Sequence, residues 1–138
     1  MEHVYRQRVY YSDTDAGGIM YHGRYLDFAE HARTEFVREI SSPEGKDSTY
    51  LDASSVGFVV KHIEVDYHTP AFLDDLLVVK SSVVSLKRFS ITLKQNIFRD
   101  DQEIACVLVK AAAVDLQNYS VKPLEPRFSK RLGEYMDS

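Results

Sequence analysis

The chain has 138 residues, a length that predicts one domain over residues 1–138 with a core of its own. Its net charge of −4 argues against a general electrostatic role on nucleic acid, although a local basic patch is compatible with a small anionic ligand. It has no apolar run near the roughly 20 residues of a membrane span, no secretory signal and one cysteine, Cys106, so we expect a cytoplasmic protein without an internal disulfide.

Residues 4–11 are rich in aromatic and β-branched side chains and are the first predicted strand. The stretch that follows, up to His22, contains the carboxylates of Asp13 and Asp15 and the glycine pair Gly17–Gly18. Glycines allow backbone angles that other residues resist, so we expect a tight turn. The turn would deliver the acidic side chains beside the first free N–H groups of a helix. A carboxylate facing a helix N-terminus suits attack on a carbonyl group, because the amides stabilise the oxyanion that develops.

From about Tyr21 to Ile40 the apolar residues recur with the period of a helix. They form one broad stripe made of Tyr25, Phe28, Ala29, Ala32, Phe36 and Ile40, widened by Leu26 and Val37. A stripe of this width on a long helix favours deep packing against a sheet. Arg33 falls inside the stripe, and we expect Glu30 to be its ion-pair partner, because an unpaired buried charge is costly.

The rest of the chain is predominantly β, after a loop over 41–55 that is expected to hold a short helix around 49–54. The predicted strands are residues 58–69, 76–87, 89–97 and 103–116, with a turn at Asp100-Asp101 and a short helix near the C-terminus. One short strand, one long helix and four long antiparallel strands predict an α+β fold in which the sheet curls around a central helix.

Short segments spread over nearly the whole chain carry a resemblance to a known family. They are Arg8-Val9-Tyr10-Tyr11, Asp13-Thr14-Asp15-Ala16-Gly17-Gly18, Tyr21-His22, Tyr25, Glu30-His31-Ala32-Arg33-Thr34-Glu35, Phe58-Val59-Val60, Val65-Asp66-Tyr67, Pro70-Ala71, Leu73-Asp74-Asp75, Val114-Asp115 and Lys122-Pro123. Through them the chain resembles the hotdog-fold acyl-CoA thioesterases of the 4-hydroxybenzoyl-CoA thioesterase type, and especially the branch associated with the bacterial Tol-Pal system. The resemblance implies the hotdog fold, an antiparallel sheet wrapped around one long central helix.

The resemblance also implies a reaction, the hydrolysis of an acyl-CoA thioester to a free carboxylic acid and CoA. The catalytic carboxylate of the family motif falls on Asp15, and the amide that polarises the thioester carbonyl falls at His22. Gly18 and Tyr21 belong to the same motif and are expected at the substrate. The reaction needs no metal or redox cofactor, and CoA enters as part of the substrate.

The family further implies self-association, because hotdog subunits typically pair through edge strands, place active sites between subunits and often stack as tetramers. Basic residues near the place of Lys87 and Arg88 approach the phosphates of CoA in this family, and arginine suits phosphate because its fork bonds two oxygens. On the sequence alone the same pair is also explained as a solvated turn between two strands. An acyl carrier protein that delivers the acyl group, and a Tol-Pal partner, are further candidates.

Several residues have a structural alternative to these roles. Asp15 could cap the helix or bond within the turn, and Asp13 is expected to organise the turn or to pair with a base such as Arg33. The ring of His22 could hold a water or hydrogen-bond Asp15. A metal site built from these acids and His22 is disfavoured, since closely spaced thiolates or histidines are missing. Cys106, in an apolar strand, is expected to be a small buried hydrophobe.

Two other functions stay open on the sequence. One is another hotdog reaction on a thioester, such as hydration of an enoyl-CoA, although the His/Asp arrangement of those enzymes is not found on the helix. The other is a non-catalytic module that binds acyl-CoA or acyl carrier protein, or a scaffold for envelope-associated proteins. Within the thioesterase interpretation, Asp15 could be either the nucleophile or a general base for water.

Overall fold

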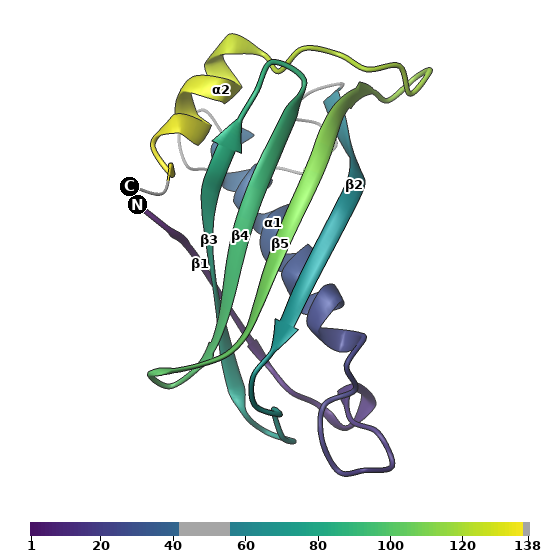
Figure 1. Ribbon diagram of the computed structural model, residues 1–138, viewed down its shortest axis with the longest axis vertical. Helices are drawn as coiled ribbons and strands as arrows, with labels where there is room; N and C mark the ends of the chain where they lie inside the picture. Colours follow the sequence, from purple (N-terminus) through teal and green to yellow (C-terminus); the bar gives the residue numbers. More distant parts are fainter. Residues whose placement is uncertain (42–55, 137–138) are drawn as a thin grey trace.

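The computed structural model describes residues 1–41 and 56–136, so the loop and short helix expected within 42–55 lie outside the described residues. Five strands form one antiparallel sheet in the order β1-β3-β4-β5-β2 (Figure 1). The strands are β1 (His3–Arg8), β2 (Val56–Tyr67), β3 (Leu76–Leu86), β4 (Ser90–Arg99) and β5 (Gln102–Asp115). The predicted α+β fold, with four long antiparallel strands, is confirmed.

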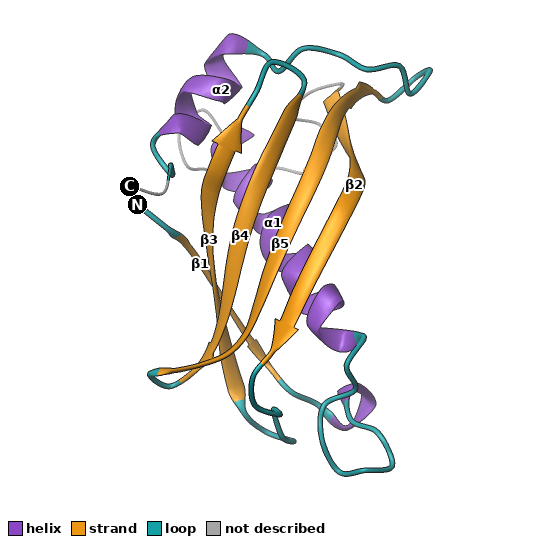
Figure 2. Cartoon of the chain, in the orientation of Figure 1, coloured by secondary structure: helices purple, strands orange, loops and turns teal. Residues whose placement is uncertain are grey.

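Within the described residues, two α-helices accompany the sheet (Figure 2). The long helix α1 (Arg24–Ser41) runs along the inner face of the sheet, and the short helix α2 (Pro126–Gly133) lies near the end of β3. All six residues of the predicted apolar stripe are buried, and they contribute to two clusters of buried side chains between α1 and the strands. No helix in the described part of the chain has the length and apolar content of a membrane span.

The segment between β1 and α1 differs from its prediction at both ends. The first strand ends at Arg8 instead of residue 11, because the chain folds into a 3-10 turn over Tyr11–Asp13. The helix begins at Arg24, three residues later than expected, because the amide of Tyr21 donates to the carbonyl oxygen of Asp13 at 2.8 Å and the chain turns once more before the helix starts. This delay leaves the amides that precede the helix outside the helical hydrogen-bond pattern.

The ion pair expected between Arg33 and Glu30 does not form. Arg33 faces the sheet, and its Nη1 donates to Oε1 of Gln95 on β4 at 3.0 Å. Glu30 is exposed, and its Oε2 accepts a hydrogen bond from the Thr34 hydroxyl at 2.8 Å. The prediction failed because helical spacing placed the two charges close together without showing which way each side chain turns.

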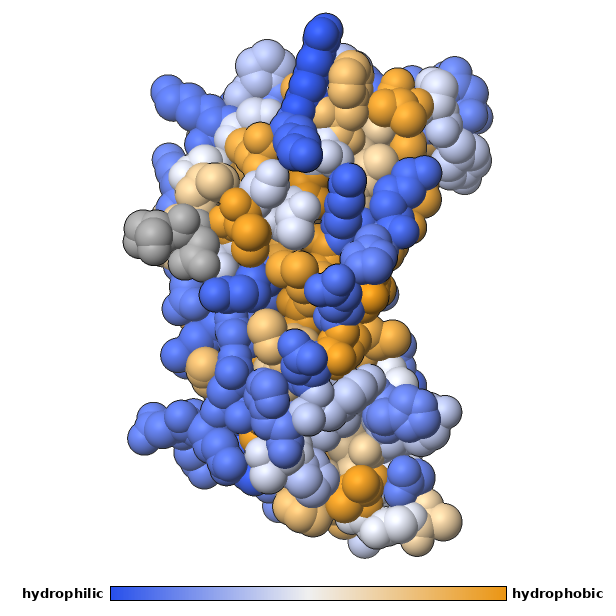
Figure 3. Space-filling model, viewed as in Figure 1, coloured by the Kyte–Doolittle hydropathy of each residue, from blue (hydrophilic) through white to orange (hydrophobic). Residues whose placement is uncertain are grey.

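Cys106 is only partly buried, which differs from the buried hydrophobe that we expected. It lies on the outer face of the sheet, where its Sγ accepts a contact of 3.7 Å from the Asn96 amide nitrogen on β4. Figure 3 shows this face, on which hydrophilic side chains (blue) are interspersed with apolar ones (orange). Partial burial raises the pKa of the Cys106 thiol, so the thiol is held in its neutral form.

His3, at the start of β1, is a buried titratable group. Its ring stacks on Phe36 at 5.2 Å, and its Nε2 lies 3.8 Å from the carboxylate of Glu39, which also accepts a hydrogen bond from the Tyr135 hydroxyl. The Nδ1 atom is buried and has no hydrogen-bond partner among the described residues. Burial lowers the pKa of His3 below its ordinary value of 6.5, and the charge of Glu39 opposes this only in part.

We therefore expect the free energy of unfolding to fall when the pH is lowered through 6.5, the ordinary pKa of histidine. The unfolded chain binds a proton at His3 near pH 6.5, whereas the folded chain does so only at a lower pH. The contribution of neutral His3 to the free energy of unfolding is complete above pH 6.5, and it is lost as the pH falls toward the lowered pKa. Urea unfolding between about pH 7.5 and about pH 5.5 measures this slope. The His3→Gln variant should lose part of it, whereas the exposed control His62→Gln should keep it; equal slopes for His3→Gln and wild type would contradict the assignment.

Candidate active site

The turn between β1 and α1 is held together by Asp13. Its Oδ2 accepts the amide of Tyr10 at 2.9 Å, and its Oδ1 lies 3.5 Å from Nε of Arg24, the first residue of α1. The structural role expected for Asp13 agrees with these contacts, but the basic partner is Arg24 and not Arg33. Arg24 meets Asp13 because the helix starts directly beside the turn, whereas Arg33 points into the sheet.

Asp15 lies two residues further on and is exposed. One carboxylate oxygen, Oδ1, accepts the amide of Gly17 at 2.8 Å, and the backbone of Asp15 bonds to Ile19 and Gly18 at 3.0 Å. Gly18 has a φ of +83°, a conformation that L side chains rarely adopt. Asp15 forms no ion pair with a described residue. The turn orients its carboxylate through Oδ1, and Oδ2 accepts no hydrogen bond from a described residue.

The backbone at His22, just before α1, is fixed by a residue from the far end of β2. The hydroxyl of Tyr67 donates to the carbonyl oxygen of His22 at 2.9 Å, and the ring of Tyr67 packs edge-on against Tyr25 at 5.1 Å. The amides of His22 and Gly23 donate to no acceptor in the described part of the chain. Two backbone donors are thus presented in front of the helix N-terminus, where the helix dipole also favours negative charge.

Asp15 and His22 line one pocket of about 290 Å³, together with Tyr25, Tyr67 and Pro70. The ring of His22 contacts Tyr21 at 4.4 Å and makes no hydrogen bond to the Asp15 carboxylate. In residues 1–41 and 56–136, no group of three or more His, Cys, Asp or Glu side chains is arranged to hold a metal ion. The pocket therefore combines a carboxylate with the helix-start backbone at His22, a combination suited to attack on a polarised carbonyl.

The other residues expected at the site fall in three places. Tyr21 lines a neighbouring hollow that Asp15 also borders, and Gly18 shapes the turn without lining either cavity. Lys87 and Arg88 lie in the exposed turn between β3 and β4, at the end of the sheet opposite to the Asp15 turn (Figure 1). A single chain therefore does not bring this basic pair to Asp15.

Sequence reasoning did not identify Tyr67 as a site residue. Tyr67 and His22 are 45 positions apart, and only the folded sheet brings the end of β2 to the start of α1. The signal in the sequence is its place in Val65-Asp66-Tyr67, a segment that carries the family resemblance.

The turn geometry predicts a specific sensitivity to substitution at Gly18. Gly18→Ala should lower the free energy of unfolding by about 1 kcal/mol, because alanine is strained at positive φ. Gly133→Ala is the matched control, since a Cβ there meets nothing within 4 Å and φ is not in the positive region. Urea unfolding of both variants provides the comparison, and an undiminished stability of Gly18→Ala would contradict the turn described above.

Comparison with known proteins identifies relatives over most of the chain. The family described as the thioesterase-like superfamily matches residues 9–132. An acyl-CoA thioesterase, YbgC, of Haemophilus influenzae is 44% identical over 109 residues, 79% of this chain and 78% of that protein. Its counterpart of the same name in Helicobacter pylori is 32% identical over 122 residues, 88% of this chain and 74% of that protein. Among solved structures, a probable thioesterase from Bartonella henselae matches with a TM-score of 0.79 and 30% identity, covering 91% of this chain and 100% of that chain.

Proposed function

This chain belongs to the thioesterase-like superfamily, and we propose that it hydrolyses the thioester of an acyl-CoA to a free carboxylic acid and CoA. The observation that carries the proposal is one pocket that combines the Asp15 carboxylate with the helix-start backbone at His22. Relatives named as acyl-CoA thioesterases at 44% and 32% identity support the same reaction and the same substrate class.

In the proposed mechanism the thioester carbonyl oxygen accepts hydrogen bonds from the amides of His22 and Gly23. These amides have no acceptor in the described structure, so they are available to stabilise the oxyanion of the tetrahedral intermediate. The hydrogen bond from Tyr67 holds this backbone in place. When the intermediate collapses, the carbon–sulfur bond breaks and CoA leaves as a thiolate, which takes a proton from solvent water or, where Asp15 acts as a general base, from the protonated Asp15 carboxyl group.

Asp15 can serve this reaction in two ways. It can attack the carbonyl carbon and form a mixed anhydride that water then hydrolyses, or it can remove a proton from a water that attacks directly. A single turnover in oxygen-18 water tests the first route. Label that enters the Asp15 carboxylate identifies direct attack, because only water that opens the anhydride at the aspartyl carbon puts its oxygen there; general-base catalysis puts the label in the released acid alone.

The free edge of β2 suggests how two copies would complete the site. β2 has 12 residues and ends the sheet on one side, whereas the other edge strand, β1, has only 6. An unpaired edge of this length, with exposed Val59 and Val60, is a template for pairing with another strand. Antiparallel pairing of two β2 strands would bring the Asp15 end of one copy toward the Lys87–Arg88 end of the other.

Analytical ultracentrifugation of the chain tests this pairing. Sedimentation at twice the mass of the chain is the expected result, and a monomer at assay concentrations would contradict this assembly.

Replacement of Asp15 tests the reaction itself. Asp15→Asn should lower the rate of CoA release by roughly 10²–10⁴-fold, because the amide is neither a useful nucleophile nor a base. The measurement is a thiol-trapping assay over a series of acyl-CoA chain lengths, with folding checked by circular dichroism. Asp101→Asn, in the exposed turn before β5, is the matched control and should keep the wild-type rate.

Equal rates for Asp15→Asn and the wild type would contradict the catalytic role. Absence of CoA release by a folded wild-type chain that still binds acyl-CoA would favour the non-catalytic binding module instead.

A further inference from the structure

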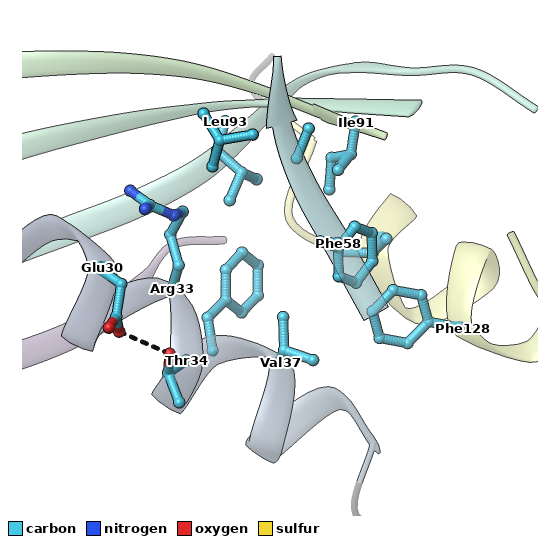
Figure 4. Close-up of a pocket in the computed structure, with 12 residues that line it drawn as sticks. Glu30, Arg33, Thr34, Val37, Phe58, Ile91, Leu93 and Phe128 are labelled. Atoms are coloured by element: carbon cyan, nitrogen blue, oxygen red, sulfur yellow. Dashed lines mark hydrogen bonds between the residues drawn. The ribbon is translucent and has the colours of Figure 1, made fainter. Parts of the chain in front are cut away.

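A second pocket lies along the later turns of α1, away from Asp15. Its volume is about 180 Å³, and α1, β2, β4, β5 and α2 all contribute to its wall. Most of the wall is apolar, with Phe58, Ile91, Leu93 and Phe128 facing the space (Figure 4). An apolar cavity of about 150 Å³ accepts a benzene molecule. This pocket therefore has room for a ring or for a chain of about six carbons.

Arg33 forms the basic end of this pocket. Its Nη1 donates to Oε1 of Gln95 at 3.0 Å, and Gln95 is fully buried. The side-chain nitrogen of Gln95 donates to the carbonyl oxygen of Ala29 and to the hydroxyl of Ser81, so the amide oxygen has to face Arg33. Gln95 thus fixes the guanidinium in the pocket wall without neutralising its charge.

The charge of Arg33 is not balanced by an ion pair with any described carboxylate. Glu30, three residues before Arg33 on α1, also lines the pocket, but its carboxylate is turned to the hydroxyl of Thr34, away from the apolar end (Figure 4). Burial lowers the pKa of Arg33, and the charge of Glu30 opposes this effect in part. A guanidinium has five N–H donors, and the bond to Gln95 uses one of them. The pocket therefore presents a cation with unused donors beside an apolar wall.

We propose that this pocket binds a free carboxylic acid of about six carbons, with the carboxylate on Arg33 and the chain against Phe58, Leu93 and Phe128. The planar guanidinium bonds two carboxylate oxygens at once, which a single hydroxyl cannot reproduce. Pairing also balances a charge that is costly to bury alone. Binding at this site does not depend on the reaction at Asp15, although a free acid belongs to the chemical class that the proposed hydrolysis releases.

Isothermal titration calorimetry with hexanoate tests this site on the full chain. Hexanoate should bind the wild type, and hexan-1-ol, which has the same chain but no carboxylate, should bind at least tenfold more weakly. Arg33→Met should weaken hexanoate binding by a similar factor. Arg38→Met is the matched control, because Arg38 lies on the same helix, pairs with Glu35 and does not line the pocket. Its affinity for hexanoate should equal that of the wild type.

Three results would overturn the proposal: no hexanoate binding at millimolar concentration, equal affinity for hexanoate and hexan-1-ol, or undiminished binding by Arg33→Met. Arg33→Met could fail to fold, because Gln95 loses its hydrogen-bond donor. In that case the ratio of hexanoate to hexan-1-ol affinity in the wild type tests the proposal by itself. Asp15→Asn should bind hexanoate as the wild type does, and a changed affinity there would assign the acid to the Asp15 pocket instead. Arg33-dependent binding in a chain that releases no CoA would sustain this inference while contradicting the proposed hydrolysis.

Discussion

The packing of α1 against the inner face of the sheet is the interaction on which the rest of the structure depends. Its six buried apolar residues hold the helix against the sheet, so the N-terminal end of the helix lies beside the end of β2. At that beginning, the Tyr67 hydroxyl reaches the carbonyl oxygen of His22 from β2, and the amide of Met20 donates to Ala71 at 2.8 Å. The hydrophobic contact therefore does more than stabilise the fold, because it holds the backbone donors in front of the Asp15 turn.

Two aspartates within this short turn illustrate how burial separates structural and chemical roles. Asp13 is buried, and its carboxylate is occupied by the amide of Tyr10 and by Arg24. Asp15 is exposed on the wall of a pocket, and its carboxylate accepts a hydrogen bond from the amide of Gly17. A carboxylate that stabilises a fold has its oxygens engaged in hydrogen bonds or ion pairs, whereas one that acts on a substrate has to keep an oxygen accessible. This contrast supports the choice of Asp15 over Asp13 for chemistry.

The sequence predicted those features that depend on local periodicity and failed where distant residues meet. Helical spacing identified all six buried residues of α1, and runs of β-forming residues between turns identified the long strands, because each pattern is set by neighbours along the chain. It assigned Glu30 to Arg33, whereas the actual partner, Gln95, is 62 positions away. It also missed Tyr67, whose contact with His22 requires the folded sheet. The separation of Lys87 and Arg88 from Asp15 likewise follows from strand direction, which residue types do not reveal.

In the two proposals the start of α1 binds a thioester carbonyl, and its later turns bind a free carboxylate. A crystal structure of the wild-type chain with an acyl-CoA analogue, in which a methylene group replaces the thioester sulfur, shows whether the helix start binds the carbonyl. We expect the ketone oxygen within hydrogen-bonding distance of the His22 or Gly23 amide, with the carbonyl carbon facing the Asp15 carboxylate. A ketone bound elsewhere, with Asp15 directed away from it, would contradict the proposed catalytic site.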